Sequence, residues 1–166
     1  MVLAVPPRPA ASLLPGLKTP SKFRAIVNAH FRFDPPRMPP PILGVVGGLV
    51  EWLFAFPQRL SVTISNGDRL VDMPREELAQ AIWRDVCKAA GAAGRLPLPP
   101  WQIVRERRAT FEATPEQNAL RPGPVTAFKN LFLAGDWTDT GLPATIEGSV
   151  RSGDRAADLV LARRQA

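Results

Sequence analysis

Residues 130–153 hold the pattern that most restricts the fold of this chain: a short apolar run, a Gly-Asp turn and a long helical segment. The run Leu131–Ala134 is continuously apolar, as expected of a strand in the middle of a sheet. Gly135 and Asp136 follow it, and a helical pattern then runs from about residue 143 to residue 163. Small residues recur along one side of this predicted helix: Gly148, Ser152 and Ala156. Such a helix can approach a sheet or a bound ligand closely.

The Gly-Asp turn and the start of the helix have chemistry that suits a nucleotide-like cofactor. Glycine lets the backbone come close to a ligand, and the carboxylate of Asp136 can accept hydrogen bonds from ribose or ribityl hydroxyls. The first backbone N–H groups, on Ala144, Thr145 and Ile146, have no partner within the helix and favour negative charge. The residues alone leave a second interpretation open, in which Asp136 is a surface turn residue beside an ordinary capped helix.

The remaining segments predict an α/β (α+β) chain. Apolar patterns of strand type occupy six ranges: 2–5, 24–33, 42–46, 50–56, 60–65 and 101–111. The strands between residues 42 and 65 are joined by short connections, which predicts an antiparallel meander. A helix is predicted from Pro74, which suits the first helical position, to Ala90. Loops are predicted at 34–41, which holds five prolines, and at 112–124.

Composition and charge exclude several classes of protein. The chain is 45% hydrophobic and 22% charged, which is typical of a globular protein. Its net charge is +6, but the arginines are scattered and lack interleaved aromatics, so we expect no nucleic-acid partner. Cys87 is the one cysteine, which indicates a packed thiol and a cytoplasmic protein without disulfides. With one histidine we expect no metal site, and no apolar run reaches the roughly 18 residues of a spanning helix.

Several segments together resemble the flavin amine oxidase and phytoene desaturase superfamily. Segments 133–138, 141–148 and 151–153 resemble its C-terminal FAD motif. Further stretches point the same way: 26–32, 51–54, 60–65, 101–104 and 106–111. Within the superfamily the resemblance is greatest to the branch that acts on a C30 isoprenoid of hopanoid biosynthesis, and it covers nearly the whole chain.

The resemblance implies a two-lobed FAD-dependent oxidoreductase. Residues 1–124 would belong to its substrate domain, with antiparallel strands and one helix, and residues 125–166 would form its C-terminal FAD-binding strand–turn–helix. The implied chemistry is removal of a hydroxyl group, with hydride from reduced flavin, which NAD(P)H would re-reduce. A water-insoluble isoprenoid substrate also implies peripheral contact with the inner face of the membrane.

The resemblance also implies roles for individual residues. Gly135 and Asp136 would contact the ribityl–pyrophosphate region of FAD, and Thr145 and Ile146, together with the backbone N–H of Ala144, would lie at the isoalloxazine edge. Neither the residues nor the resemblance identifies a catalytic residue.

Two departures from the superfamily pattern affect the functional prediction. The N-terminal G-x-G-x-x-G fingerprint is absent; the glycines of 44–48 have the wrong spacing and no helix pattern follows them. Without that loop the FAD pyrophosphate has no cradle, so we expect a chain that starts mid-fold and needs an N-terminal partner chain or a homodimer. Thr145 stands where amine oxidases often place an aromatic, which argues against an amine substrate. Three alternatives stay open: a carotenoid or phytoene-type desaturase, a flavin amine oxidase, and a non-catalytic module that requires a separate FAD-binding chain.

Two groups outside the motif are candidates for substrate contact. Asn28 and His30 share one face of the strand at 24–33, either as a polar spot that meets a substrate hydroxyl or as an ordinary solvated face. Trp52, Phe54 and Phe56 alternate along another strand, where they would line a hydrocarbon tunnel or form ordinary core.

Overall fold

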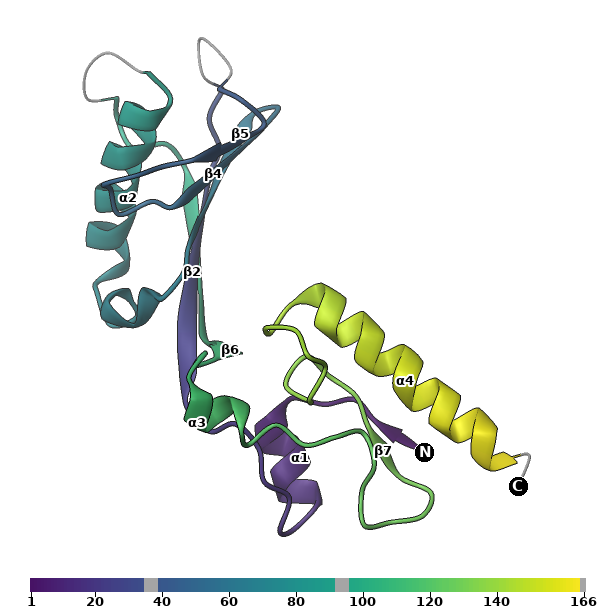
Figure 1. The fold of residues 1–166 in the computed structure, drawn as a ribbon. Coiled ribbons are helices and arrows are strands. Elements are labelled where there is room, and N and C mark those ends of the chain that lie inside the picture. The colour runs from purple at the N-terminus through teal and green to yellow at the C-terminus, as the bar shows by residue number, and fades with distance from the viewer. Residues whose placement is uncertain (35–38, 92–95, 165–166) are drawn as a thin grey trace. The chain divides into compact units, whose positions relative to one another are not determined.

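The computed structural model describes residues 1–34, 39–91 and 96–164 (Figure 1). Backbone contacts divide the chain into two units: unit 1 is Met1–Phe23 with Thr110–Ala166, and unit 2 is Arg24–Ala109. These structural units do not follow the functional boundary predicted at residue 124. The assignment of 1–124 to substrate and 125–166 to FAD therefore stays a prediction.

An antiparallel meander forms most of the sheet of unit 2. The strands are β2 (Phe23–Phe31), β3 (Ile42–Gly44), β4 (Trp52–Phe56), β5 (Arg59–Ile64) and β6 (Trp101–Phe111), in the spatial order β3-β4-β5-β2-β6. The pairs β3–β4, β4–β5 and β2–β5 are antiparallel. The meander predicted at 42–65 is confirmed as β3-β4-β5, with β3 and β4 shorter than their apolar runs, and β2 pairs with β5. Of the loop predicted at 34–41, residues 35–38 lie outside the described residues.

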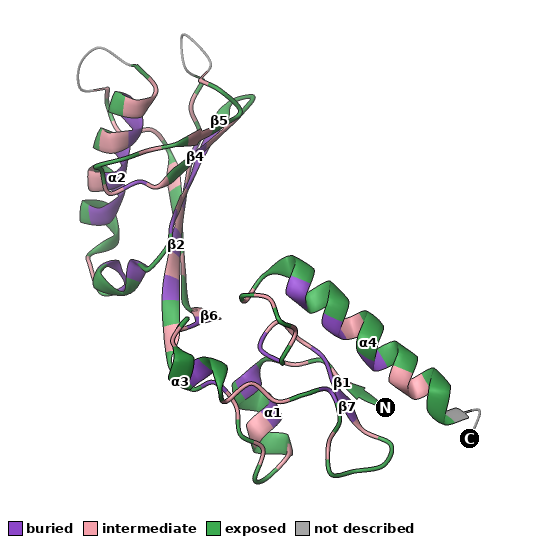
Figure 2. Cartoon of the chain, viewed as in Figure 1, coloured by how far each residue is buried: buried purple, intermediate pink, exposed green. Residues whose placement is uncertain are grey.

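Helix α2 (Arg75–Ala89) covers one face of this sheet (Figure 1). It begins at Arg75, one residue later than predicted, because Pro74 is its N-cap, and it carries Glu76 and Glu77 in its first turn. Leu78, Ile82 and Val86 recur at a spacing of four, so one side of the helix is fully buried, as Figure 2 shows. They pack against the alternate residues of β2 that were predicted to face inward: Ala25, Val27, Ala29 and Phe31. Cys87 lies in the same core, and burial raises the pKa of its thiol.

Unit 1 contains a parallel pair of short strands. In it, β1 (Val2–Leu3) pairs with β7 (Phe132–Leu133), with Val2 opposite Phe132. Helix α1 (Pro7–Leu13) follows β1, and α4 (Ile146–Arg164) runs alongside β7 (Figure 1). The strand predicted at 131–134 is confirmed over Phe132–Leu133, where it belongs to a parallel pair and not to the middle of a larger sheet.

Three local predictions need correction. The segment 112–124 contains a short helix, α3 (Pro115–Asn118), which Thr114 caps by accepting a hydrogen bond from the N–H of Gln117 at 3.3 Å. Its four residues are too few for an apolar period to show. A 3-10 turn, η1 (Gly67–Leu70), extends the predicted turn after β5. Helix α4 begins at Ile146 and not at residue 143, because the side chain of Thr145 caps it. No helix in the described parts of the chain is long and apolar enough to cross a membrane.

Candidate functional site

The turn that follows β7 has room for glycine alone at its first position. Gly135 has φ of +144°, and a Cβ there would lie 2.5 Å from Nε1 of Trp137. The indole of Trp137 is buried and donates from Nε1 to the carbonyl of Val5 at 2.9 Å. The N–H of Gly135 donates to Oγ of Ser152 on α4 at 2.7 Å. Strand, turn and helix are therefore bound to one another around this glycine.

Arg121 holds the same turn from the other side. Its guanidinium donates to the carbonyl of Asp136 at 3.1 Å, to the carbonyl of Thr138 at 2.9 Å and to Oγ1 of Thr140 at 2.9 Å. The guanidinium also lies 5.1 Å from the ring centroid of Phe111. Burial lowers the pKa of Arg121, while the nearby acids Asp136 and Asp139 oppose that shift. Nothing in the sequence around Arg121 predicted this role, because its partners lie 15 to 19 residues further along the chain.

Asp136 is half-buried at this turn. Burial raises the pKa of its carboxyl group, and the backbone N–H of Trp137 and the charge of Arg121 act in the opposite direction without cancelling the increase. A carboxylate that is partly removed from water and whose backbone is fixed is a strong acceptor for hydroxyl groups of a ligand.

The start of α4 presents backbone donors, although the helix begins three residues later than predicted. Oγ1 of Thr145 accepts a hydrogen bond from the N–H of Gly148 at 3.1 Å, so this threonine caps the helix. Within the described residues, no acceptor pairs with the N–H groups of Ile146 and Glu147. The Ile146 side chain is 86% exposed. Of the three predicted donors, Ile146 lies at the first position of the helix, whereas Ala144 and Thr145 precede it, and Glu147 provides the second unpaired N–H.

A cavity of about 460 Å³ lies in unit 1, and of the predicted cofactor residues Ala144 alone lines it. Ala144 and Pro143 line it together with Arg121 and Phe111, and its remaining lining comes from the segment around α3. The sequence indicated Ala144, but it did not indicate Phe111 or Arg121. Arg121, which holds the turn, and the two residues that precede Thr145 therefore line the same apolar cavity.

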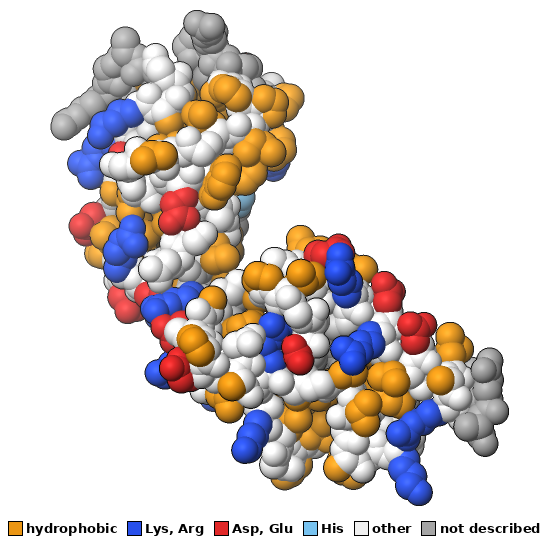
Figure 3. Space-filling model, viewed as in Figure 1, with side chains coloured by type: hydrophobic (Ala, Val, Ile, Leu, Met, Phe, Trp, Pro, Cys, Tyr) orange, Lys and Arg blue, Asp and Glu red, His pale blue; other side chains and the backbone are white. Residues whose placement is uncertain are grey.

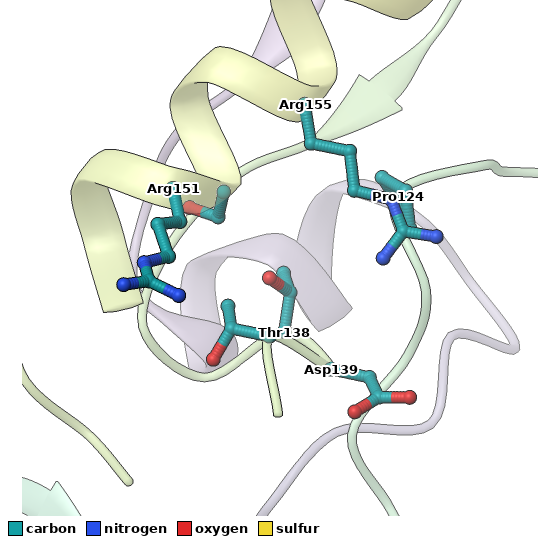
Figure 4. Close-up of a pocket in the computed structure, with 7 residues that line it drawn as sticks. Pro124, Thr138, Asp139, Arg151 and Arg155 are labelled. Carbon is teal, nitrogen blue, oxygen red and sulfur yellow. The ribbon is translucent and has the colours of Figure 1, made fainter. Parts of the chain in front are cut away.

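A second, smaller pocket of about 60 Å³ lies between the turn and α4 (Figure 4). In Figure 4, Arg155 extends from α4 toward Pro124, while Thr138 and Asp139 lie beneath the helix. Arg151 at the other end of the pocket is bound to Glu147, with 2.7 Å between Nε and Oε1. The volume is too small for a flavin ring, so the larger cavity is the better candidate for a cofactor.

Asn28 and His30 belong to unit 2 and are described there by themselves. Both lie on the face of β2 opposite the α2 core. On the neighbouring strand β5, Ser61 pairs with His30 and Thr63 pairs with Asn28. Trp52 and Phe56 lie on that same face and are 47% and 41% exposed. The interpretation of these aromatics as ordinary core is therefore wrong for Trp52 and Phe56.

The residues of unit 1 fit one end of a flavin dinucleotide. Asp136 offers a half-buried carboxylate, and the start of α4 offers two unpaired N–H groups, while the backbone of Gly135 itself is bonded to Ser152 and Thr138. In the described parts of the chain, no group of three or more His, Cys, Asp or Glu could hold a metal ion. The carboxylate thus suits hydroxyl groups of a ligand, and the N–H groups suit an electron-rich ring edge.

Comparisons with known proteins agree with this geometry. The family model for flavin-containing amine oxidoreductases matches residues 1–161. Hydroxysqualene dehydroxylases from Sinorhizobium fredii and Rhodopseudomonas palustris are 80% and 76% identical over 97% and 100% of this chain, which spans 38% and 39% of their lengths. Carotene desaturases are more distant relatives. A crystal structure described as a protoporphyrinogen oxidase, from Exiguobacterium, shares the fold with a TM-score of 0.70 at 18% identity, over 99% of this chain and 41% of its own. The chain belongs to the family of flavin-containing amine oxidoreductases.

Proposed function

We propose that this chain supplies the C-terminal part of an FAD-dependent oxidoreductase that converts hydroxysqualene to squalene. The observation that carries the proposal is 80% identity to a hydroxysqualene dehydroxylase across nearly the whole chain. Carotenoid-type desaturation and amine oxidation are weaker candidates, because the carotene desaturases among the relatives share far less sequence and Thr145 replaces the aromatic that suits an amine.

Within that enzyme, unit 1 would hold one end of FAD. Gly135 and Asp136 would meet the ribityl–pyrophosphate region, and the N–H groups at the start of α4, with Ala144 and Thr145 beside them, would face the isoalloxazine edge. When bound and reduced, the flavin supplies hydride. A helix N-terminus at that edge favours negative charge there, which stabilises the anionic reduced form.

The finer assignments belong to the same proposal. The substrate is a C30 isoprenoid alcohol, and NAD(P)H is the reductant that returns the flavin to its reduced form. We place the enzyme in the cytoplasm, with peripheral contact at the inner face of the membrane that dissolves its substrate. Asn28 and His30 would contact the substrate hydroxyl.

A visible absorption spectrum tests the cofactor assignment. The purified chain is mixed with FAD, desalted and scanned. The Asp136→Ala variant, which removes the proposed carboxylate, is treated in the same way. Retained flavin bands near ~370 and ~450 nm in the wild type, and their loss in the variant, would support binding by Gly135, Asp136 and α4. Bands of equal height in both proteins would contradict this site.

A second candidate is a module that binds FAD only together with a separate N-terminal chain. The parallel pair in unit 1 favours it, because its strands are two residues long and such a small sheet buries little surface. The test joins the chain to the N-terminal part of the Sinorhizobium fredii relative that lies outside the matched region. We call this fusion the completed enzyme. Flavin retained by the completed enzyme, and by a mixture of its two separate parts, but not by the chain alone, would establish the module.

A further inference from the structure

One face of the unit 2 sheet is divided into an apolar half and a polar half. Strand register sets two rows across four strands, with their members on the face opposite α2: Ile42–Phe54–Ser61–His30 and Gly44–Trp52–Thr63–Asn28. The indole of Trp52 lies over Gly44, since a Cβ at residue 44 would be 3.5 Å from the ring. Figure 3 shows hydrophobic side chains gathered over this part of unit 2. The face therefore offers a hydrocarbon surface next to a strip of hydrogen-bonding groups.

The polar half is internally bonded and leaves one ring nitrogen available. Nδ1 of His30 lies 3.0 Å from Oγ of Ser61, directly opposite on β5. Beside this pair, Oγ1 of Thr63 donates to Oδ1 of Asn28 at 2.8 Å. Ser61 is only 7% exposed, so its hydroxyl has a fixed position and orients the imidazole. No described residue pairs with Nε2 of His30.

The proposed reaction needs a proton at the substrate oxygen. Hydroxide is a poor leaving group, and an alcohol carbon loses its oxygen readily only after that oxygen is protonated. The side chains that border His30 from β5 and along β2 are the hydroxyls of Ser61 and Thr63, the amide of Asn28 and the guanidinium of Arg32, which are types of group that do not give up a proton near neutral pH. The strand on the other side of β2, β6, carries Glu106, whose carboxylate accepts a hydrogen bond from the N–H of Arg108 at 3.1 Å. Imidazole is the side chain that carries a transferable proton in that range.

We propose that His30 is the general acid of the dehydroxylation, with Ser61 as its positioning residue, an inference that rests on the proposed function. Nε2 gives its proton to the hydroxyl group as the C–O bond breaks, so that water leaves and a carbocation remains. The carbocation then takes hydride from a two-electron donor, a role that reduced flavin would fill under the proposed function. In sum, the alcohol, one proton and one hydride give the hydrocarbon and water, and the hydride donor is oxidised by two electrons. His30 regains its proton from solvent.

The apolar half of the face explains how the alcohol reaches this proton. Trp52 and Phe54 lie one strand away from Thr63 and Ser61, so a hydrocarbon chain packed on the aromatics places a mid-chain hydroxyl at the polar strip. The two halves thus select a long apolar molecule that carries a single hydroxyl group.

The test uses two substrates that differ in their need for a proton. The completed enzyme is reduced in advance, and single-turnover product formation is followed with the alcohol and with the corresponding chloride, whose leaving anion needs no proton. We expect His30→Gln to slow the alcohol by about 100-fold or more and to leave the chloride unchanged. Ser61→Ala should slow the alcohol less and also spare the chloride. Arg32→Gln, two residues along the chain from His30, is the matched control and should match the wild type on both.

Binding is measured separately from turnover. The alcohol is titrated into the oxidised enzyme while the flavin absorbance is followed, and His30→Gln, whose amide still hydrogen-bonds a hydroxyl, should change the Kd far less than the rate. A variant that loses both substrates equally, or that keeps its rate on the alcohol, would overturn the role of His30. A wild-type completed enzyme that holds flavin but converts neither substrate would instead overturn the proposed function, and the inference with it.

Discussion

The guanidinium of Arg121 and the carbonyl oxygen of Thr138 are joined by two hydrogen bonds, at 2.9 Å from Nε and 2.5 Å from a terminal nitrogen. Arg121 precedes β7, whereas Thr138 lies in the turn after it. The clamp therefore closes a loop around the strand and fixes the backbone that carries Asp136. A positive charge on this turn also offsets part of the cost of burying that carboxylate.

Arg121→Gln should release this clamp. We expect it to lower the free energy of unfolding by about 1.5–3 kcal/mol, the usual worth of hydrogen bonds to a charged group, and to weaken FAD binding. Urea unfolding of the chain and FAD titration of the completed enzyme measure the two effects. Arg8→Gln on the exposed surface of α1 is the matched control. An Arg121→Gln variant with wild-type unfolding and wild-type FAD affinity would contradict the clamp.

Ser152→Ala should destabilise unit 1 more than its small volume change suggests. Oγ of Ser152 accepts from the N–H of Gly135 and donates to the carbonyl of Ser149, both at 2.7 Å, in a buried position. Removing the hydroxyl leaves the N–H of Gly135 without its partner, at a cost of about 1–3 kcal/mol. Thermal unfolding of the chain measures this loss. Ser149→Ala, an exposed serine three residues earlier on α4, should unfold like the wild type.

The features that the sequence predicted correctly are those with a local period. Alternation in β2 predicts that Val27 and His30 lie on opposite faces of the strand, and Val27 is buried in the core. The apolar residues of α2 recur at helical spacing, and they form its buried side. The strand at 131–134 and the Gly-Asp turn were also found from neighbouring residues. Each of these depends on residues within a few positions of one another, where pattern and structure are directly linked.

The features that the sequence did not reveal depend on long-range partners. Arg121 is bound to a turn more than a dozen residues away, and Trp137 donates to Val5, 132 residues before it. The start of α4 was predicted at residue 143 because a proline suits the first helical position, and the hydrogen bond between Thr145 and Gly148 places it at Ile146 instead. The pairing of His30 with Ser61 needed the strand register, which alternation alone does not set.

Substituting alanine at two glycines, Gly135 and Gly153, should change the free energy of unfolding in opposite directions. Gly135→Ala brings a Cβ to 2.5 Å from Trp137 at a positive φ, so we expect a loss of about 1–3 kcal/mol or more from overpacking and strain. Gly153 lies inside α4, and a Cβ added there would meet nothing within 4 Å, so Gly153→Ala should stabilise the chain by about 0.5–1 kcal/mol. Chemical denaturation of both variants gives the two signs. A neutral Gly135→Ala would show that the turn can move away from the indole.

Asp136→Asn should separate stability from cofactor binding. Burial raises the pKa of Asp136, so the folded chain holds this proton more tightly than the unfolded chain does. The linked stability is fully present below the ordinary pKa of an aspartate and is lost as pH rises through the raised folded pKa. At pH 7 the ionised carboxylate therefore costs stability, and the isosteric amide removes that cost. We expect the variant to unfold at a higher temperature than the wild type at pH 7, and the difference to shrink as the pH falls toward and below the ordinary aspartate range. FAD affinity of the completed enzyme should fall by about 10- to 100-fold, because an amide replaces a charged acceptor. A variant that is less stable than the wild type at pH 7 would contradict the cost of burying the carboxylate. A variant that binds FAD as the wild type does would contradict its role in binding the cofactor.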